Sequence, residues 1–407
     1  MRTAAIITEY NPFHNGHAYQ LDRVRQLSGA DFILVVMSGD FVQRGTPAIF
    51  DKYLRAEMAL RCGADLVLEL PCAAASGSAP RFASGAAALL DGLNVVDELW
   101  FGSEEGRMEP FAALADFLSH EPENFRLKLK DCLRSGVSFP SARMQALLAL
   151  FPELNLPFDS AEALRAFLTS PNNILGLEYC LALRRLNSPI CPRTLKRVGS
   201  GYHQEELSAR FSSASAIRRS LLRLGPESVR RQVPEQVYSL LAEAWNSSIA
   251  LQEDDFSLPL RYQLLKETES SLRQYLDVPE DLARRILRLQ NEYVSYSQFA
   301  ALLKTRNNTR TNMNRALLHI LLGLTLQDAE ASVSPSCARI LGLGSCSGLL
   351  TAIKANGSLP LISKTADLPA GLYEKELFAS NLYETVRAWK SGQPFIHEYS
   401  RQIRIIR

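Results

Sequence analysis

Four short apolar runs alternate with helix-like segments over the first quarter of the chain, and this alternation restricts the fold more than any other feature. The apolar runs occupy residues 4–7, 31–37, 65–71 and 98–102. Helical periodicity fills the intervals at about 16–28, 51–62 and 78–90. Strands that alternate with helices at this spacing form parallel βαβ units. The sequence therefore predicts an α/β fold with a parallel sheet and helices on both of its faces.

Polar segments follow three of these predicted strands at the point where each strand ends. They are the loop after Ile7, the Ser-Gly-Asp sequence at 38–40 and the Gly-Ser-Glu sequence at 102–104. In a parallel sheet, ligands bind outside the carboxyl ends of the strands. We therefore expect the functional site at this edge of the sheet.

The rest of the chain is predominantly helical. Helices are predicted at 110–120, 123–133, 141–150, 160–169 and 171–186, a returning strand at 193–199, and a further helix from about Ser215. Residues beyond 235 are helix-rich to about 329, and short strands at 339–342 and 359–363 suggest a small α/β tail. We accordingly divide the chain into a catalytic region, 1–235, and a helix-rich C-terminal region, 236–407.

Composition excludes several classes of protein and favours none strongly. The 45 Lys and Arg residues nearly balance the 43 Asp and Glu residues, so only local clustering could indicate a nucleic-acid partner. Seven cysteines occur without a Cys-x-x-Cys pair, a usage typical of reduced thiols. The N-terminal apolar run is too short for a secretion signal, and no run reaches the roughly 20 residues of a membrane span. We therefore expect a cytoplasmic protein that makes no membrane contact.

The loop after the first strand reads Pro-Phe-His-Asn-Gly-His and carries the strongest chemical signal. His14 and His17 are three residues apart at a helix start, where free backbone amides and the helix dipole favour an anion. Gly16 permits close approach of the backbone. Two alternatives remain open: a solvated helix start, and a zinc site completed by Glu9. Position after the first strand favours a nucleotide site, in which both histidines donate hydrogen bonds to phosphate oxygens as charge develops.

A second motif extends this interpretation by resemblance. The histidine loop is similar to that of the HxGH nucleotidyltransferase superfamily, which has a Rossmann-like core and carries an Ile-Ser-Ser-Thr-x-Ile-Arg motif at a later helix start. Here residues 212–218 read Ser-Ser-Ala-Ser-Ala-Ile-Arg, a loose match. The resemblance implies that Ser213, Ser215 and Arg218 hold the β- and γ-phosphates of a nucleotide. Without it, the two serines are only candidate helix caps and Arg218 a surface charge.

Longer blocks resemble one family within that superfamily, the tRNA(Met) cytidine acetate ligases. The matching blocks are 7–17, 38–47, 63–71, 170–176 and 196–203. The resemblance implies an ATP-dependent ligase that activates acetate as acetyl-AMP. It also implies transfer of the acetyl group to the exocyclic amine of the wobble cytidine of elongator tRNA(Met). Magnesium is expected to accompany the ATP phosphates, and no metal-ligating residues are assigned.

The same resemblance supplies the candidate ATP-binding residues. Those around the histidine loop are Ile7, Thr8, Glu9, Tyr10, Asn11, Pro12, Phe13, His14, Asn15, Gly16, His17, Ala18, Tyr19 and Gln20. Gly102 would let the nucleotide approach the backbone, Asn172 would hydrogen-bond it, and Arg197 would contact phosphate or base. Each of these residues also has a simpler alternative role: Gly102 as a strand end, Asn172 as a helix-start residue and Arg197 as a solvated cation.

Three further cations follow the second predicted strand. Lys52 and Arg55 alternate with Asp51 and Glu57, which favours a solvated, charged helix face. In the less favoured alternative, the side chain of Arg44 or Lys52 contacts acetate or pyrophosphate.

Two segments carry cations and no acidic residue. The first contains Arg184, Arg185, Arg193, Lys196 and Arg197; the second contains Lys304, Arg306, Arg310 and Arg315, with Tyr293, Tyr296 and Phe299 just before it and several asparagines within it. Such segments can bind phosphate while nearby aromatic rings stack on unpaired bases, although solvated helix faces remain an equal alternative.

These observations favour a ligase whose partners are acetate and tRNA. One rival is a nucleotidyltransferase that adenylylates a small phosphorylated metabolite and needs no basic C-terminal region. Another is a non-catalytic RNA-binding protein on the same fold, against which the intact histidine pair argues. The sequence leaves the oligomeric state open.

Overall fold

One twisted sheet forms the centre of the molecule in the computed structural model, which describes residues 1–197, 212–247, 250–305, 308–368 and 373–406. Its strand order is β10-β8-β5-β2-β1-β6-β7, with β9 paired to β8. The strands are β1 Thr3–Thr8, β2 Phe32–Ser38, β5 Leu66–Leu70, β6 Glu98–Ser103, β7 Cys191–Lys196, β8 Ala338–Leu343, β9 Leu361–Ile362 and β10 Arg404–Ile405. Strands β1, β2, β5, β6 and β7 are parallel, as predicted.

Helices cover both faces of the sheet, which confirms the predicted fold class. In β1, Ala4 and Ile6 belong to one apolar core and Ala5 and Ile7 to the other, because successive side chains point to opposite faces. Helices α1 (Asn15–Ser28) and α2 (Lys52–Arg61) cover the first face with α10 (Ala214–Leu224) and α11 (Glu235–Ser247). The other face is covered by α3 (Cys72–Ala75), α4 (Ala79–Gly92), α9 (Pro171–Arg185) and α18 (Ser347–Asn356).

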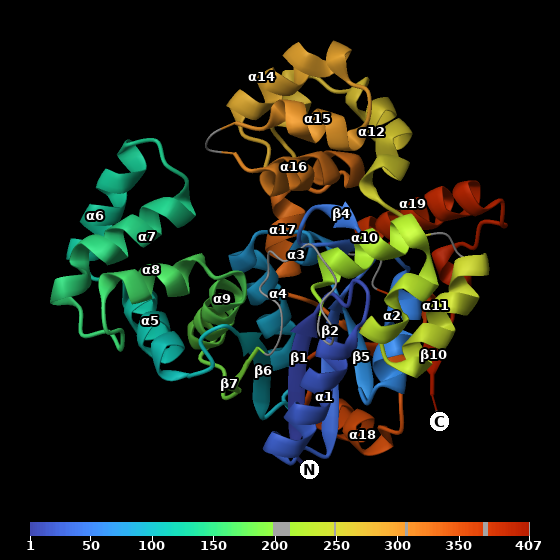
Figure 1. Ribbon diagram of the computed structural model, residues 1–407, viewed down its shortest axis with the longest axis horizontal. Helices are drawn as coiled ribbons and strands as arrows, with labels where there is room; N and C mark the ends of the chain where they lie inside the picture. Colours follow the sequence, from blue (N-terminus) through green and yellow to red (C-terminus); the bar gives the residue numbers. More distant parts are fainter. Residues whose placement is uncertain (198–211, 248–249, 306–307, 369–372, 407) are drawn as a thin grey trace.

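Two helical lobes project from this core (Figure 1). The side lobe lies between β6 and α9 and contains α5 (Glu109–His120), α6 (Glu123–Arg134), α7 (Phe139–Leu150) and α8 (Ala161–Thr169). The upper lobe contains α12 (Ser257–Leu264), α13 (Glu269–Leu272), α14 (Glu280–Leu289), α15 (Tyr296–Leu303) and α16 (Arg310–Leu322), and α17 (Leu326–Ser332) leads back from it. Its apolar core includes Phe256, Phe299 and Leu317 and extends to α19 (Glu374–Ser391).

The strands of the C-terminal tail extend the main sheet. Strand β8 pairs antiparallel with β5, so the predicted parallel sheet becomes mixed at this edge, and β10 then pairs with β8. Every residue of β5 is buried, and β8 supplies the second neighbour that its backbone groups require. The tail therefore belongs structurally to the same sheet as the histidine loop.

A small hairpin connects the sheet to the upper lobe. Strands β3 (Phe41–Val42) and β4 (Thr46–Pro47) follow β2 and form this antiparallel pair. Within the described parts of the chain, no helix is long and apolar enough to cross a membrane.

Candidate active site

His14 and His17 are fixed by reciprocal hydrogen bonds at the start of α1. The backbone N–H of Gly16 donates to Nδ1 of His14 at 3.1 Å, and the backbone N–H of His14 donates to Nδ1 of His17 at 3.3 Å. The two rings stack with centroids 3.7 Å apart. Because each Nδ1 accepts a hydrogen bond, a neutral ring carries its proton on Nε2. Each histidine can therefore present an Nε2–H donor to an anion.

Burial and neighbouring cations keep both imidazoles neutral. Burial, followed by the charges of Arg197 and Arg218, lowers the pKa of His14 from 6.5 to about 3. The pKa of His17 is also well below its ordinary value, because of burial, the adjacent His14 ring and Arg197. The charge at this site therefore comes from the two arginines, while the histidines contribute neutral donors.

Gly16 lies directly beneath the His14 ring. A Cβ at this position would lie 3.0 Å from Cε1 of His14 and 3.1 Å from its Nδ1. A side chain would therefore displace the ring, which gives a steric reason for glycine between the two histidines.

The loop residues that precede His14 are held in place by contacts in the protein interior. Tyr10 and Phe13 are buried in the core, and the Tyr10 ring packs against the rings of Phe13 and His17 with centroids 4.7 and 4.8 Å away. The Asn11 side chain accepts a hydrogen bond from the Ile49 N–H at 2.8 Å. Ile7 and Pro12 are also buried, and Thr8 Oγ1 accepts a hydrogen bond from the Tyr10 N–H at 3.3 Å. Most of these side chains position the loop. Its two histidines present Nε2–H donors, and the buried Tyr10 hydroxyl has no hydrogen-bond partner among the described residues.

The remaining loop candidates lie around the start of α1. The Asn15 amide donates to the Arg231 carbonyl at 2.8 Å, and Glu9 Oε1 accepts the Gln43 N–H at 3.0 Å. Ala18 and Gln20 are half-buried on α1, and Tyr19 is exposed there. The carboxylate of Glu9 therefore holds the β3–β4 hairpin, a different role from zinc ligation. Among the described residues, no group of three or more His, Cys, Asp or Glu side chains could hold a metal ion.

The second motif packs directly against the histidine loop. Helix α10 begins after Ser213, whose Oγ accepts the Ala216 N–H at 3.1 Å. Arg218 donates to the Asn11 carbonyl at 2.6 Å and to Ser215 Oγ at 3.2 Å. Arg218 is therefore a bridge between α10 and the loop, and not the isolated surface charge that the sequence left as an alternative. The fold brings together two segments separated by about two hundred positions.

Gly102 and Arg197 are neighbours at the ends of β6 and β7. Gly102 pairs with Leu195 in the sheet, and a Cβ on Gly102 would lie 3.4 Å from Cγ of Arg197. Arg197 is exposed, and its charge acts on both histidines. A Cβ at position 102 would make an ordinary van der Waals contact with this arginine stem, which lies beside the strand end.

Asn172 contacts protein at the start of α9, and its neighbour Asn173 was missed by sequence reasoning. The Asn172 amide donates to Glu104 Oε1 at 2.6 Å. Asn173 is buried, and its Oδ1 accepts the N–H groups of Glu104 and Glu105 at 3.0 and 3.1 Å. The pair therefore fixes the loop that follows β6. The only sequence signal was the doubled asparagine after a proline.

The predicted solvated face of α2 is wrong, because Lys52 and Arg55 are completely buried. Arg55 donates to the carbonyls of Phe50 at 2.9 Å, Glu9 at 2.6 Å and Ser38 at 3.0 Å, and also to Gly39. It therefore joins the carboxyl end of β2 to the histidine loop. The apolar residues on both sides of Arg55 were a signal that sequence reasoning undervalued.

Lys52 lies in a buried cluster of charges formed with the C-terminal part of the chain. Its Nζ lies 2.8 Å from both Glu69 and Glu398 and 2.7 Å from Ser380 Oγ. Arg339 completes the cluster at 3.1 Å from Glu69 and 2.6 Å from Glu398. The Lys52 ammonium group is thus engaged by carboxylates, while Arg44 is exposed on the β3–β4 hairpin.

Acidic residues from other elements neutralise much of the two basic segments. Arg184 pairs with Asp116, Arg193 lies 3.4 Å from Glu98, and Arg315 lies 3.2 Å from Asp277. The suggested stacking role of Tyr296 and Phe299 is wrong, because both rings are buried in the upper lobe. Arg306 lies outside the described residues.

The sheet, the histidine loop at its β1 end and the serine–arginine helix start together define a nucleotidyl transferase site. A family model described as HIGH Nucleotidyl Transferase matches residues 1–394. The tRNA(Met) cytidine acetate ligase of Acetivibrio thermocellus is 37% identical over 97% of this chain and 98% of that protein. The protein of the same name from Clostridium perfringens is 37% identical over 94% of this chain and 95% of its own length.

Solved structures agree with these sequence matches. Thermotoga maritima TmcAL without ligand superposes with a TM-score of 0.93 at 30% identity, covering 100% of both chains. The same protein bound with alpha-thio ATP gives a TM-score of 0.90 at 30% identity, covering 99% of this chain and 100% of that one. The chain belongs to the HIGH nucleotidyl transferase family and, within it, to the tRNA(Met) cytidine acetate ligases.

Proposed function

We propose that this protein is an ATP-dependent ligase that activates acetate as acetyl-AMP and acetylates the wobble cytidine of elongator tRNA(Met). The observation that carries the proposal is the neutral, stacked pair His14 and His17 beside Arg197 and Arg218. This arrangement occurs in a chain 37% identical throughout its length to a tRNA(Met) cytidine acetate ligase. A structural relative at 30% identity binds an ATP analogue.

In the first step, an acetate oxygen attacks the α-phosphorus of ATP. A bond forms between that oxygen and phosphorus, the bond to the bridging β-phosphate oxygen breaks, and pyrophosphate leaves with the electron pair. Nε2–H of His14 and of His17 would donate to α-phosphate oxygens, where negative charge increases in the transition state. Neither ring needs to accept a proton, because the attacking carboxylate is already ionised at neutral pH.

The other candidate residues would contact different parts of the ATP triphosphate. Ser213, Ser215 and Arg218 would hold the β- and γ-phosphates at the start of α10, where backbone amides favour anions. Arg197 would contact the phosphates or the base beside Gly102. Asn172 would reach the nucleotide after exchanging its present partner Glu104.

Magnesium is part of the proposal as the counter-ion of the triphosphate. It would neutralise charge on the leaving pyrophosphate. Because the described residues contain no cluster of three potential ligands, its coordination would come mainly from phosphate oxygens and water.

In the second step, the exocyclic amine of the cytidine attacks the carbonyl carbon of acetyl-AMP. The carbon–nitrogen bond forms, AMP leaves, and the amine loses one proton to solvent. The mixed anhydride is already activated, so the protein mainly has to bring the anticodon to the adenylate. We propose that the protein acts on tRNA in the cytoplasm.

A labelling experiment tests the proposal against both rivals. The full chain is incubated with ATP, magnesium and labelled acetate, with or without tRNA(Met). We expect acetyl-AMP in both reactions and labelled tRNA only when tRNA is added. AMP transfer to a phosphorylated metabolite without acetate would support the transferase instead. Binding of tRNA with no adenylate would support the non-catalytic alternative.

A further inference from the structure

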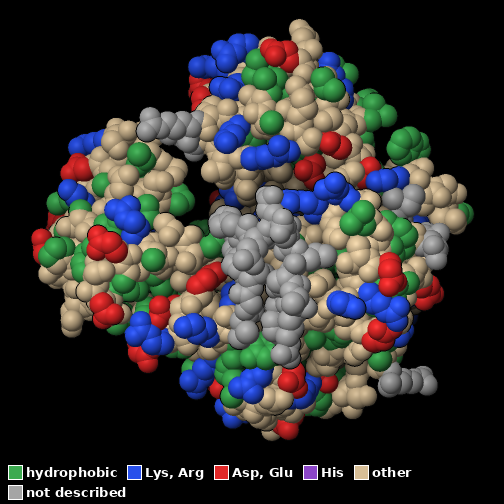
Figure 2. Space-filling view, in the orientation of Figure 1, with side chains coloured by type: hydrophobic (Ala, Val, Ile, Leu, Met, Phe, Trp, Pro, Cys, Tyr) green, Lys and Arg blue, Asp and Glu red, His purple; other side chains and the backbone are tan. Residues whose placement is uncertain are grey.

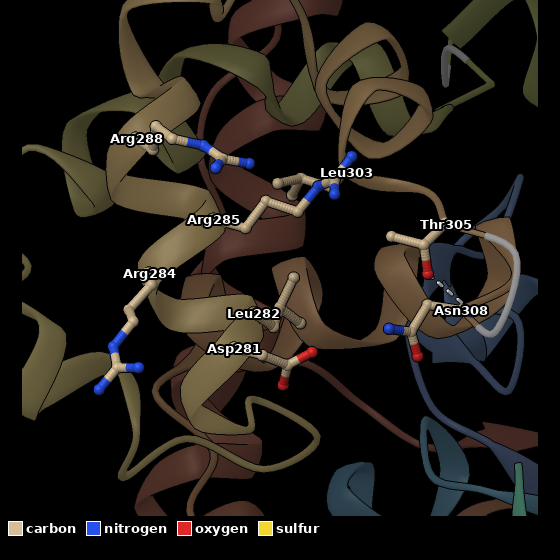
Figure 3. A pocket seen from close by; sticks show the side chains of 8 residues that line it. All are labelled: Asp281, Leu282, Arg284, Arg285, Arg288, Leu303, Thr305 and Asn308. Carbon is tan, nitrogen blue, oxygen red and sulfur yellow. Dashed lines mark hydrogen bonds between the residues drawn. The ribbon is translucent and has the colours of Figure 1, made fainter. Parts of the chain in front are cut away.

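A small basic pocket lies on the upper lobe, away from the histidine loop. Its volume is about 250 Å³, and it is bounded by α14, by Leu303 at the end of α15, and by Thr305 and Asn308. Leu282 and Leu303 form its base, and the polar side chains of Thr305 and Asn308 form one wall. Figure 3 shows Arg285 and Arg288 extending from α14 toward Leu303, while Arg284 points the other way.

The arginines of the pocket differ sharply in their partners. Arg284 pairs with Glu269 at 2.9 Å and with Glu280, so its charge is compensated. Arg288 makes no hydrogen bond or ion pair with any residue that the structure describes, and the same holds for the side chain of Lys304. Arg285 donates to the Leu302 carbonyl at 3.2 Å, but its buried Nε has no partner among the described residues. The pocket therefore carries positive charge on Arg288 that no described acid pairs with.

The pocket belongs to a lobe that is fixed relative to the histidine loop. The Tyr296 hydroxyl lies 3.2 Å from the Gly45 carbonyl of the β3–β4 hairpin and 2.8 Å from the Asn314 carbonyl of α16. Gly45 packs so closely on the α16 backbone that a Cβ would overlap Arg315. Glu9 in turn holds this hairpin through Gln43. The lobe that carries the pocket is therefore anchored to the hairpin that Glu9 holds beside the histidine loop.

The surroundings of the pocket suit an extended polyanion. Figure 2 shows Lys and Arg side chains on the flank of the upper lobe, and a hollow between this lobe and the side lobe. An exposed guanidinium group can stack on an unpaired base or pair with a phosphate, and both interactions are common in single-stranded RNA recognition.

We propose that this pocket receives one unpaired nucleotide of the tRNA substrate and so acts as an RNA-anchoring subsite remote from the reaction. Arg288 and Lys304 contact the flanking phosphates. Asp281 and Asn308 lie at the same pocket and can pair with the edge of a base that carries an exocyclic amine. The inference rests on the proposed function in taking tRNA as the partner.

Binding of a tRNA(Met) transcript to the full-length protein, measured at several salt concentrations, tests the subsite. The Arg288→Ala variant should bind tRNA about tenfold more weakly, because a charged hydrogen bond to phosphate is lost. The slope of log affinity against log salt should fall by about one. Arg288→Lys should retain the salt slope. Arg284→Ala is the matched control on the same helix, and its affinity should equal that of the wild type.

Two results would overturn the subsite. Equal tRNA affinity of Arg288→Ala and Arg284→Ala would remove the role of Arg288. If Arg288→Ala lost as much affinity for a fully paired RNA duplex as for a stem-loop of the same length, the pocket would not bind an unpaired nucleotide.

Acetate-dependent exchange of pyrophosphate into ATP, measured without tRNA, separates this inference from the proposed function. The exchange should be the same in Arg288→Ala and in the wild type. If the wild type shows no exchange but Arg288→Ala still loses tRNA affinity, the proposed ligase fails and the RNA subsite stands. If exchange is present and tRNA affinity is unchanged, the subsite fails and the ligase stands.

Discussion

Nδ1 of His17 accepts a hydrogen bond from the backbone N–H of His14, 3.3 Å away, while the two rings stack face to face. This relationship determines more than the orientation of the rings. It places the exchangeable proton of the neutral His17 ring on Nε2, the Gly16 N–H does the same for His14, and burial keeps both rings neutral. The site therefore combines neutral donors with the permanent charge of arginines.

The first prediction concerns the pH dependence of adenylate formation. Because the pKa of His14 lies near 3 in the folded protein, the ring is neutral throughout the neutral range. Acetate-dependent pyrophosphate exchange should therefore be flat between about pH 6 and pH 8. A site that used imidazolium would lose activity as pH rises through 6.5, so an inflection there would contradict neutral donors.

The second prediction separates the two functions of His14. Asparagine can replace its role as helix cap, but it cannot supply the Nε2–H. His14→Asn should lower pyrophosphate exchange by about 100-fold or more while tRNA affinity stays unchanged. His120, which is exposed on α5, provides the matched control, and His120→Asn should retain full exchange. Parallel loss of tRNA affinity in His14→Asn would place the histidine in RNA binding instead.

His14 also gives the protein a stability that depends on pH. The unfolded chain binds a proton at His14 near pH 6.5, whereas the folded chain does so only near pH 3. The contribution of neutral His14 is therefore complete above about pH 6.5 and is lost as pH falls toward 3, at up to about 1.4 kcal/mol per pH unit. Urea unfolding of the wild type and of His14→Asn across this range should show the difference shrinking on acidification. A constant difference would mean that His14 titrates normally.

A further prediction tests the buried arginine that joins β2 to the histidine loop. Arg55→Met leaves several buried carbonyls without a donor, and each such group costs about 1–3 kcal/mol. Urea unfolding should show a loss of at least about 3 kcal/mol in the free energy of unfolding. Arg61→Met on the same helix removes only a surface pair with Glu57 and should change stability little. Equal effects of the two variants would contradict the structural role of Arg55.

The last prediction concerns the buried charge cluster around Lys52. Lys52→Met leaves Arg339 as the cation that Glu69 and Glu398 still share, so one buried charge of the cluster is uncompensated and stability should fall by about 3–5 kcal/mol. Adding Glu398→Gln removes that uncompensated charge, so the double variant should be more stable than the sum of the two single effects predicts. A coupling free energy of zero in this cycle would show that the two side chains act independently.

Much of the fold and part of the candidate site follow from the sequence alone. The alternation of apolar runs and helical segments determined the parallel βαβ core, because periodicity records which side of an element is buried. The histidine loop could be placed at the end of β1 for the same reason. The local sequence also marked Ser213 as a helix start, since a serine side chain caps free amides.

Only the tertiary structure decided which elements cover one another. Lys52 and Arg55 look solvated within their own helix, but α19 and the histidine loop bury them and supply their partners. Arg184 and Arg315 look unpaired along the chain, yet acids on distant segments neutralise them. The addition of β8 to the edge of β5 is equally invisible in either strand alone. The hydrophobic periodicity of a segment indicates which of its own residues are buried. The partners of those residues depend on long-range packing, which the local sequence does not encode.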